Sequence, residues 1–119
     1  MYAVRFVIDW ICVYSRFINF TYGTNGIRVP SPYLVNKLDK EDVAAAFSRA
    51  RERGAQIIIA LPHWGDEYVL KPNKEQKEWE KYLYELGADA VIGSHPHVIQ
   101  LLEIRDKDSL SKQVTLYSL

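Results

Sequence analysis

Apolar residues recur with helical spacing in the segment that follows residue 39. Four of them fall at positions i, i+3, i+4 and i+7 and so share one face of a helix: Val43, Ala46, Phe47 and Ala50. Asp39 precedes this pattern in the position of an N-cap, and Gly54 follows it as a stop signal. The pattern therefore predicts an amphipathic helix between these two residues.

Two short apolar runs flank a second helical pattern. Residues 56–61 and 90–92 show no polar alternation, which is typical of strands buried on both faces of a sheet. Between them, Asn73 and Gln76 form a capping-box pattern. An apolar stripe follows it, made of Trp79, Tyr82, Leu83 and Leu86. The strand–helix–strand order predicts a right-handed crossover between two parallel strands.

Further strands are predicted at both ends of the chain. Residues 98–104 and 114–117 have strand character, and the charged turn between them predicts an antiparallel hairpin. The first twenty residues are the most apolar segment, but Arg5, Asp9 and Arg16 interrupt it. Charges at such positions are unfavourable in a bilayer, so we interpret this segment as one or two core strands. The predicted fold class is α/β.

Composition narrows the class of protein. The chain has 119 residues, 48% of them hydrophobic, which fits one small globular domain. Because 15 basic residues balance 15 acidic ones, the chain has no net field to attract nucleic acid, and we expect no nucleic-acid partner. A single cysteine excludes a disulfide within the chain. Residues 22–32 are rich in Gly, Asn, Ser and Pro and predict a connecting loop.

All three histidines follow the two strands that we predict to be parallel. Because ligands gather at the carboxyl ends of parallel strands, His63 is expected near His95 and His97. Pro96 favours an extended backbone at His95, in which both rings of the pair would point to one side. Imidazole is the commonest metal ligand, but a single histidine is more often a surface or core residue. From the residues alone, a metal site and a purely structural role for the three histidines are equally well supported.

Several motifs in the second half of the chain resemble those of one family. They are His63-Trp64-Gly65 with Glu67 and Tyr68, Pro72 with Gln76, Gly87-Ala88-Asp89, and Gly93-Ser94-His95-Pro96-His97. Residues 22–26 resemble a loop of the same family. Over about residues 20–119 the chain resembles the CapA-type capsule biosynthesis family, which acts in poly-γ-glutamate synthesis. That family is itself similar to the calcineurin-like metallophosphoesterases.

The resemblance implies a fold and a metal centre. The fold would be the C-terminal half of an αββα metallophosphoesterase-like sandwich. His63, His95 and His97 would bind one or two divalent ions, with Mn, Fe and Zn equally compatible. The early Asp, Gly-Asp and Asn-His motifs of the superfamily do not occur before residue 20. We therefore expect an atypical, irregularly packed segment at residues 1–20 and a partial domain at residues 21–119, inactive by itself.

The resemblance also implies a biological role. We expect a phosphoesterase-type hydrolase at the bacterial cell surface, membrane-associated through an N-terminal part, with capsule polymer or a phosphoester as its substrate. The alternative is a non-catalytic component that binds metal or polymer within a capsule export or anchoring complex.

Four residues near the histidines require a separate prediction; two of them have alternative roles and two are expected to be structural. Glu67 would either orient a histidine ring or be a plain surface carboxylate. Trp64 would either line the substrate cleft or pack in the core. Gln100 and Glu103 alternate along a predicted strand and are expected to face solvent.

Overall fold

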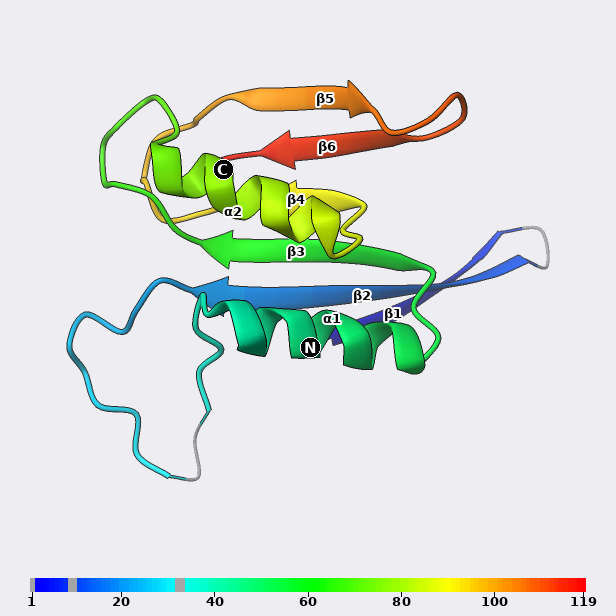
Figure 1. The fold of residues 1–119 in the computed structure, drawn as a ribbon, viewed down its shortest axis with the longest axis horizontal. Helices are drawn as coiled ribbons and strands as arrows, with labels where there is room; N and C mark the ends of the chain where they lie inside the picture. The colour runs from blue at the N-terminus through cyan, green and yellow to red at the C-terminus, as the bar shows by residue number, and fades with distance from the viewer. Residues whose placement is uncertain (1, 9–10, 32–33) are drawn as a thin grey trace.

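The computed structural model describes residues 2–8, 11–31 and 34–119. Their helices and strands are β1 (Tyr2–Ile8), β2 (Ile11–Thr21), α1 (Lys40–Glu52), β3 (Ile57–His63), α2 (Lys74–Glu85), β4 (Ala90–Ile92), β5 (Leu102–Asp106) and β6 (Lys112–Leu116). The strands form one sheet in the order β1-β2-β3-β4-β6-β5. Both helices lie over the same face of this sheet (Figure 1). The architecture confirms the α/β prediction.

The centre of the sheet is parallel and its edges are antiparallel. β2, β3, β4 and β6 run in the same direction, whereas β1 pairs antiparallel with β2 and β5 pairs antiparallel with β6. The predicted crossover from β3 through α2 to β4 is therefore present, and so is the terminal hairpin. As a result, β2, β3 and β4 end at the same edge of the sheet.

Both helices begin where the sequence predicts. The Asp39 side chain accepts hydrogen bonds from the backbone N–H groups of Glu41 and Asp42 at the start of α1. Asn73 and Gln76 form a complete capping box at the start of α2. These caps satisfy N–H groups that have no partner within the helix, so each start is specified locally.

The core lies between the two helices and the sheet. α1 contributes Val43, Ala46, Phe47 and Ala50, which are the four residues of its predicted apolar face. Ile58 and Ala60 of β3 pack below them and have no exposed surface.

The opposite face of the sheet carries apolar side chains without a helix above them. Along β3 the buried positions alternate with Ile57, Ile59 and Leu61, which are partly exposed. By strand register, Leu102 and Ile104 of β5 lie on this same face and are 54% and 58% exposed. We call this surface the helix-free face.

The N-terminal segment is more ordered than the sequence suggests. β2 pairs with β3 from Ser15 to Thr21, and its Ile18 and Phe20 are at most 3% exposed. The expectation of irregular packing is therefore wrong for this part, because parallel pairing with β3 draws it into the core. The boundary expected between residues 20 and 21 falls inside β2. Asp9 lies outside the described residues.

The terminal hairpin is shorter than predicted at its start. β5 begins at Leu102 rather than at residue 98. The segment before it is not a strand, although the Gln100 N–H donates to Ser118 O and the Tyr117 N–H donates to Leu101 O. Within the described residues, neither helix has the length and apolar character needed to cross a bilayer.

Candidate metal centre

The three histidines converge at the carboxyl ends of β3 and β4. His63 is the last residue of β3, and it forms a parallel bridge with Ser94 in the loop after β4. The backbone N–H of Ser94 donates to Pro62 O, and that of Trp64 donates to Ser94 O, each at 3.0 Å. These bonds extend the sheet by one step and hold the loop that carries His95 and His97 beside His63.

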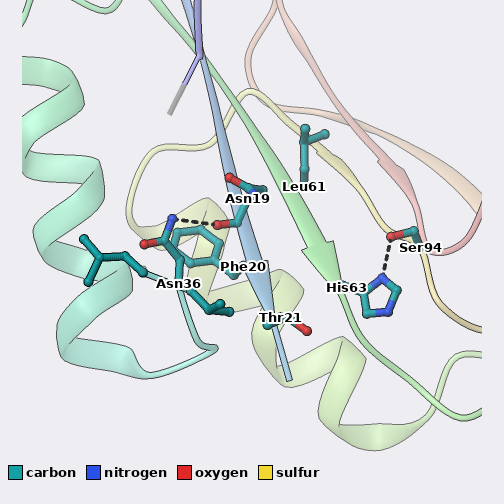
Figure 2. Close-up of a pocket in the computed structure, with 9 residues that line it drawn as sticks. Asn19, Phe20, Thr21, Asn36, Leu61, His63 and Ser94 are labelled. Atoms are coloured by element: carbon teal, nitrogen blue, oxygen red, sulfur yellow. Dashed lines mark hydrogen bonds between the residues drawn. The ribbon is translucent and has the colours of Figure 1, made fainter. Parts of the chain in front are cut away.

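Ring-to-ring distances define the cluster. The ring centroid of His95 is 4.7 Å from that of His63 and 5.8 Å from that of His97. Burial lowers the pKa of His63, and the nearby His95 and His97 lower it further. His63 is therefore held in its neutral form at neutral pH, the form that can bind a metal ion. Its Nδ1 lies 3.1 Å from Ser94 Oγ (Figure 2).

Glu67 joins the cluster from the loop after β3. Its Oε1 is 3.9 Å from Nε2 of His97. Among the described residues, Glu67, His95 and His97 form a group whose ligand atoms all lie within 4.8 Å of one another. Two imidazoles and a carboxylate form a donor set that suits Zn, Fe or Mn.

The backbone around the histidines is not extended, contrary to our expectation. His95 has a φ of 106° and His97 a φ of 58°, and Tyr68 in the facing loop has a φ of 62°. Residues other than glycine rarely adopt such angles, which cost on the order of 1–3 kcal/mol each and cluster at functional sites. The two rings are therefore brought together by strained turns rather than by strand alternation.

A direct contact holds the two loops together. The backbone N–H of Tyr68 donates to Pro96 O at 2.7 Å. The Tyr68 ring stacks on that of His97, with 5.8 Å between centroids and 27° between planes. Glu67 is thus positioned beside the histidine pair by its neighbour in sequence.

Tyr22 is a site residue that sequence reasoning did not identify. It follows β2 directly, and its ring centroid is 4.7 Å from that of His95 and 6.0 Å from that of His63. Its backbone N–H donates to His63 O at 3.0 Å. The histidines were predicted to meet because they follow the carboxyl ends of parallel strands. The same reasoning applied to β2, which ends just before Tyr22, could have identified this residue.

Two other residues with expected roles are buried. Trp64 is 2% exposed, and its indole N–H donates to Tyr117 O at 2.8 Å, an arrangement that suits a packing role. Gln100 is 4% exposed, so the expectation that it faces solvent is wrong. Its buried amide hydrogen-bonds to Gln76 and to Val69 O, partners that lie far away in sequence. Glu103 is partly buried and pairs with Arg105.

A pocket of about 780 Å³ opens beside the cluster at the ends of β2 and β3. Figure 2 shows His63 and Ser94 on one side of this pocket and Asn19, Thr21 and Asn36 on another. Leu34 and Val35 add apolar surface from the loop before α1. The pocket has room for a small molecule or a polymer segment, with amide and hydroxyl groups that can form hydrogen bonds to it.

Comparison with known proteins yields one family and two relatives. The model of the family described as bacterial capsule synthesis protein PGA_cap matches residues 16–119. PGA biosynthesis protein CapA of Bacillus subtilis (strain 168) is 35% identical over 66 residues, which are 56% of this chain and 17% of the relative. Capsule biosynthesis protein CapA of Bacillus anthracis is 35% identical over 54 residues, which are 45% of this chain and 13% of the relative. No solved structure shows a significant match.

Proposed function

The chain belongs to the bacterial capsule synthesis protein family PGA_cap, and from this premise we propose that it supplies half of the metal centre of a phosphoesterase-type hydrolase in capsule biosynthesis. The observation that carries the proposal is the convergence of all three histidines and Glu67 at one edge of the sheet. Such an arrangement is unexpected for residues that serve only the fold, because three of the four side chains are solvent-exposed.

The cluster provides what a divalent ion requires. Imidazole nitrogens from His95 and His97 and a carboxylate oxygen from Glu67 would hold the ion. When bound, a divalent ion supplies Lewis acidity toward a water molecule or a phosphoryl oxygen. The His63 ring lies 4.7 Å from that of His95 between centroids, and His63 also lines the adjacent pocket, so it is placed to contact a ligand there.

The cluster supports a half-site rather than a complete dinuclear centre. In the part of the chain that the structure describes, Glu67 is the one carboxylate grouped with the histidines. Two adjacent dications need more negative charge than a single carboxylate provides, commonly from a bridging carboxylate. The matched segments cover 17% and 13% of the two curated relatives, so most of each relative lies outside the similarity. Further ligands would come from the rest of such a domain.

The helix-free face supports the same proposal. Its accessible apolar residues, among them Ile57, Leu102 and Ile104, are the kind that a second sheet covers in a sandwich. We assign this face to the interior of an αββα sandwich whose other half is supplied by the remainder of the domain. We propose that this activity serves capsule synthesis at the bacterial cell surface, with poly-γ-glutamate or a phosphoester as the substrate; membership of a capsule synthesis family supports this.

The test measures metal binding and turnover on the same chain. Titration calorimetry with Mn²⁺ or Zn²⁺ should detect a bound ion in the wild type and none in His95→Ala, while the remote control Glu41→Gln binds as the wild type does. Hydrolysis of bis(4-nitrophenyl) phosphate should be absent with either ion. Metal-dependent hydrolysis that is lost in His95→Ala would show that the half-site account is wrong. A wild type that binds no metal but binds poly-γ-glutamate would favour the non-catalytic alternative.

A further inference from the structure

We propose that a pocket between the start of α2 and the segment before β5 is a subsite for a carboxylate-bearing polymer. It lies where the loop after β3 meets that segment (Figure 1), and it is lined by Leu70, Lys71, Pro72, Lys77 and Leu101. We call it the lysine pocket. The identity of the polymer rests on the proposed function, whereas the pocket is defined by its own side chains.

The lysine pocket is separate from the histidine cluster but belongs to the same two loops. Leu70 follows Glu67 by three residues, and Leu101 follows His97 by four. Because an extended chain spans at most about 3.6 Å per residue, the backbone at these leucines lies within roughly 11 Å of Glu67 and roughly 14 Å of His97. A polymer bound in the pocket can therefore reach the proposed metal centre.

The floor of the lysine pocket is apolar and open to solvent. Leu70 and Leu101 are 69% and 51% exposed, and Pro72 adds a rigid apolar ring. The Gln100 amide donates to Val69 O at 2.7 Å, which joins the residue before one leucine to the residue before the other. The two leucines are thus held beside each other before any ligand binds.

The two ammonium groups of the lysine pocket have no carboxylate partner among the described residues. In that part of the chain, the lysines that form ion pairs are Lys74, Lys81, Lys107 and Lys112. Lys77 lies three residues after Lys74 and four before Lys81, spacings at which like charges on a helix repel. A bound anion would offset this repulsion, so the pocket favours a negatively charged ligand.

The combination of charge and apolar floor specifies the ligand further. Lysine binds carboxylate and phosphate groups alike, as a point charge. Leucine and proline surfaces favour methylene groups, which inorganic phosphate and polyphosphate lack. Poly-γ-glutamate carries a carboxylate and two consecutive methylene groups in every unit. The pocket volume of about 420 Å³ accommodates a short segment of such a chain.

The net charge of the chain argues against a general polyanion surface. Its 15 basic and 15 acidic residues cancel, so no overall positive field gathers anions of every kind. Attraction is confined to local groups such as Lys71 and Lys77. Held there, the polymer would extend along the two loops toward the histidines, and the pocket would select the chain that is presented to them.

The first experiment measures the fluorescence anisotropy of a labelled poly-γ-glutamate oligomer with the 119-residue chain, in EDTA so that no metal takes part. Lys71→Gln combined with Lys77→Gln should raise the Kd about 10-fold, because one exposed ion pair changes affinity by up to about 5-fold. The control combines Lys107→Gln with Lys112→Gln. It makes the same change of charge at the far end of the β5–β6 hairpin and should leave the Kd unchanged.

The second experiment tests the apolar floor. Leu101→Ala should raise the Kd for the oligomer about 4-fold, the effect of one buried methylene group, and leave the Kd for inorganic polyphosphate unchanged. Leu110→Ala removes an exposed leucine from the turn between β5 and β6 and serves as the control. All the substituted side chains are exposed, and circular dichroism checks that each variant folds.

The outcomes separate this inference from the proposed function. An unchanged Kd in the double variant of the lysine pocket would overturn the subsite. Equal affinity for the oligomer and for polyphosphate of matched charge would also overturn it, by showing a general anion site. A chain that binds the oligomer but no Mn²⁺ would refute the metal centre and keep the subsite, and a chain that binds Mn²⁺ but no oligomer would do the reverse.

Discussion

The side chains of Gln76 and Gln100 meet in the interior, where the Gln76 amide donates to the Gln100 side-chain oxygen at 2.8 Å. Gln76 is 1% exposed and also accepts from the backbone N–H of Asn73 at the start of α2. Gln100 donates to Val69 O. Because Val69 lies in the loop that carries Glu67 and Gln100 lies in the loop that carries His95 and His97, the pair connects the two loops.

Gln76→Leu should therefore weaken both the fold and the site. The substitution leaves the Gln100 oxygen and the Asn73 N–H without their partners, and each buried loss of this kind costs about 1–3 kcal/mol. We expect a lower urea midpoint and a higher Kd for Mn²⁺. Gln113→Leu makes the same chemical change in β6, away from both loops, and should leave Mn²⁺ affinity unchanged. Equal affinity in wild type and Gln76→Leu would show that the pair does not position the loops.

Gly93 is a position where no side chain fits. A Cβ atom there would lie 2.2 Å from Tyr117 O and 2.3 Å from Trp64 Nε1, the two atoms of a buried hydrogen bond. Neither the backbone carbonyl nor the buried indole can move away cheaply. We expect Gly93→Ala to lower the free energy of unfolding by about 3 kcal/mol, as measured by urea denaturation. Gly23→Ala is the control, because its Cβ would meet nothing within 4 Å; similar midpoints for the two variants would contradict the packing argument.

Alkaline pH should destabilise the fold through the tyrosines near Glu80. The buried Glu80 carboxylate accepts from Thr115, whose hydroxyl also meets Tyr84 Oη at 2.8 Å. Burial raises the pKa of Tyr84. Burial and the charge of Glu80 together raise the pKa of Tyr117. A raised folded-state pKa means that the unfolded chain loses its proton first, so stability is full below pH 10 and falls as the pH rises toward the folded values.

The measurement is the urea midpoint at pH 8 and at about pH 10.5. Tyr84→Phe removes one of the two phenols whose pKa is raised, and should show a smaller fall between these values than the wild type. It should also be less stable at pH 8, since it loses the hydrogen bond to Thr115, worth about 1 kcal/mol. Tyr82→Phe removes another hydroxyl from the same helix and should keep the wild-type fall. An identical pH dependence in Tyr84→Phe would exclude Tyr84 as a contributor.

The features that the sequence predicted well depend on local chemistry or on topology. The starts of α1 and α2 follow from Asp39 and Asn73, whose capping partners lie within three residues. The approach of His63 to His95 follows from parallel strands that end at one edge. Neither inference needed contacts between distant side chains.

The features that it missed depend on such distant contacts. Gln100 is buried where its side chain accepts a hydrogen bond from Gln76. Because Gln76 lies 24 positions away, nothing near Gln100 in the sequence indicates this burial. His95 departs from the extended backbone that Pro96 favours, since the loop must meet Tyr68 across the site. The hydrogen bond from Tyr68 to Pro96 and the stacking of Tyr68 on His97 together outweigh the local preference of His95 for an extended backbone.

Tyr22 should contribute to metal affinity without touching the ion. Its ring packs against His63 and His95, and its hydroxyl donates to Asn25 Oδ1 at 2.8 Å. An aromatic contact of this kind is worth about 0.5–1.5 kcal/mol, which corresponds to roughly a 2- to 10-fold change in affinity if it restricts the ring of His95. Calorimetry should therefore show a Kd for Mn²⁺ raised by that factor in Tyr22→Ala. Tyr22→Phe keeps the ring and loses only the bond to Asn25, so it should bind nearly as the wild type does. If Tyr22→Phe lost as much affinity as Tyr22→Ala, the hydroxyl and its loop would be responsible; if Tyr22→Ala lost none, the ring would have no part in positioning His95.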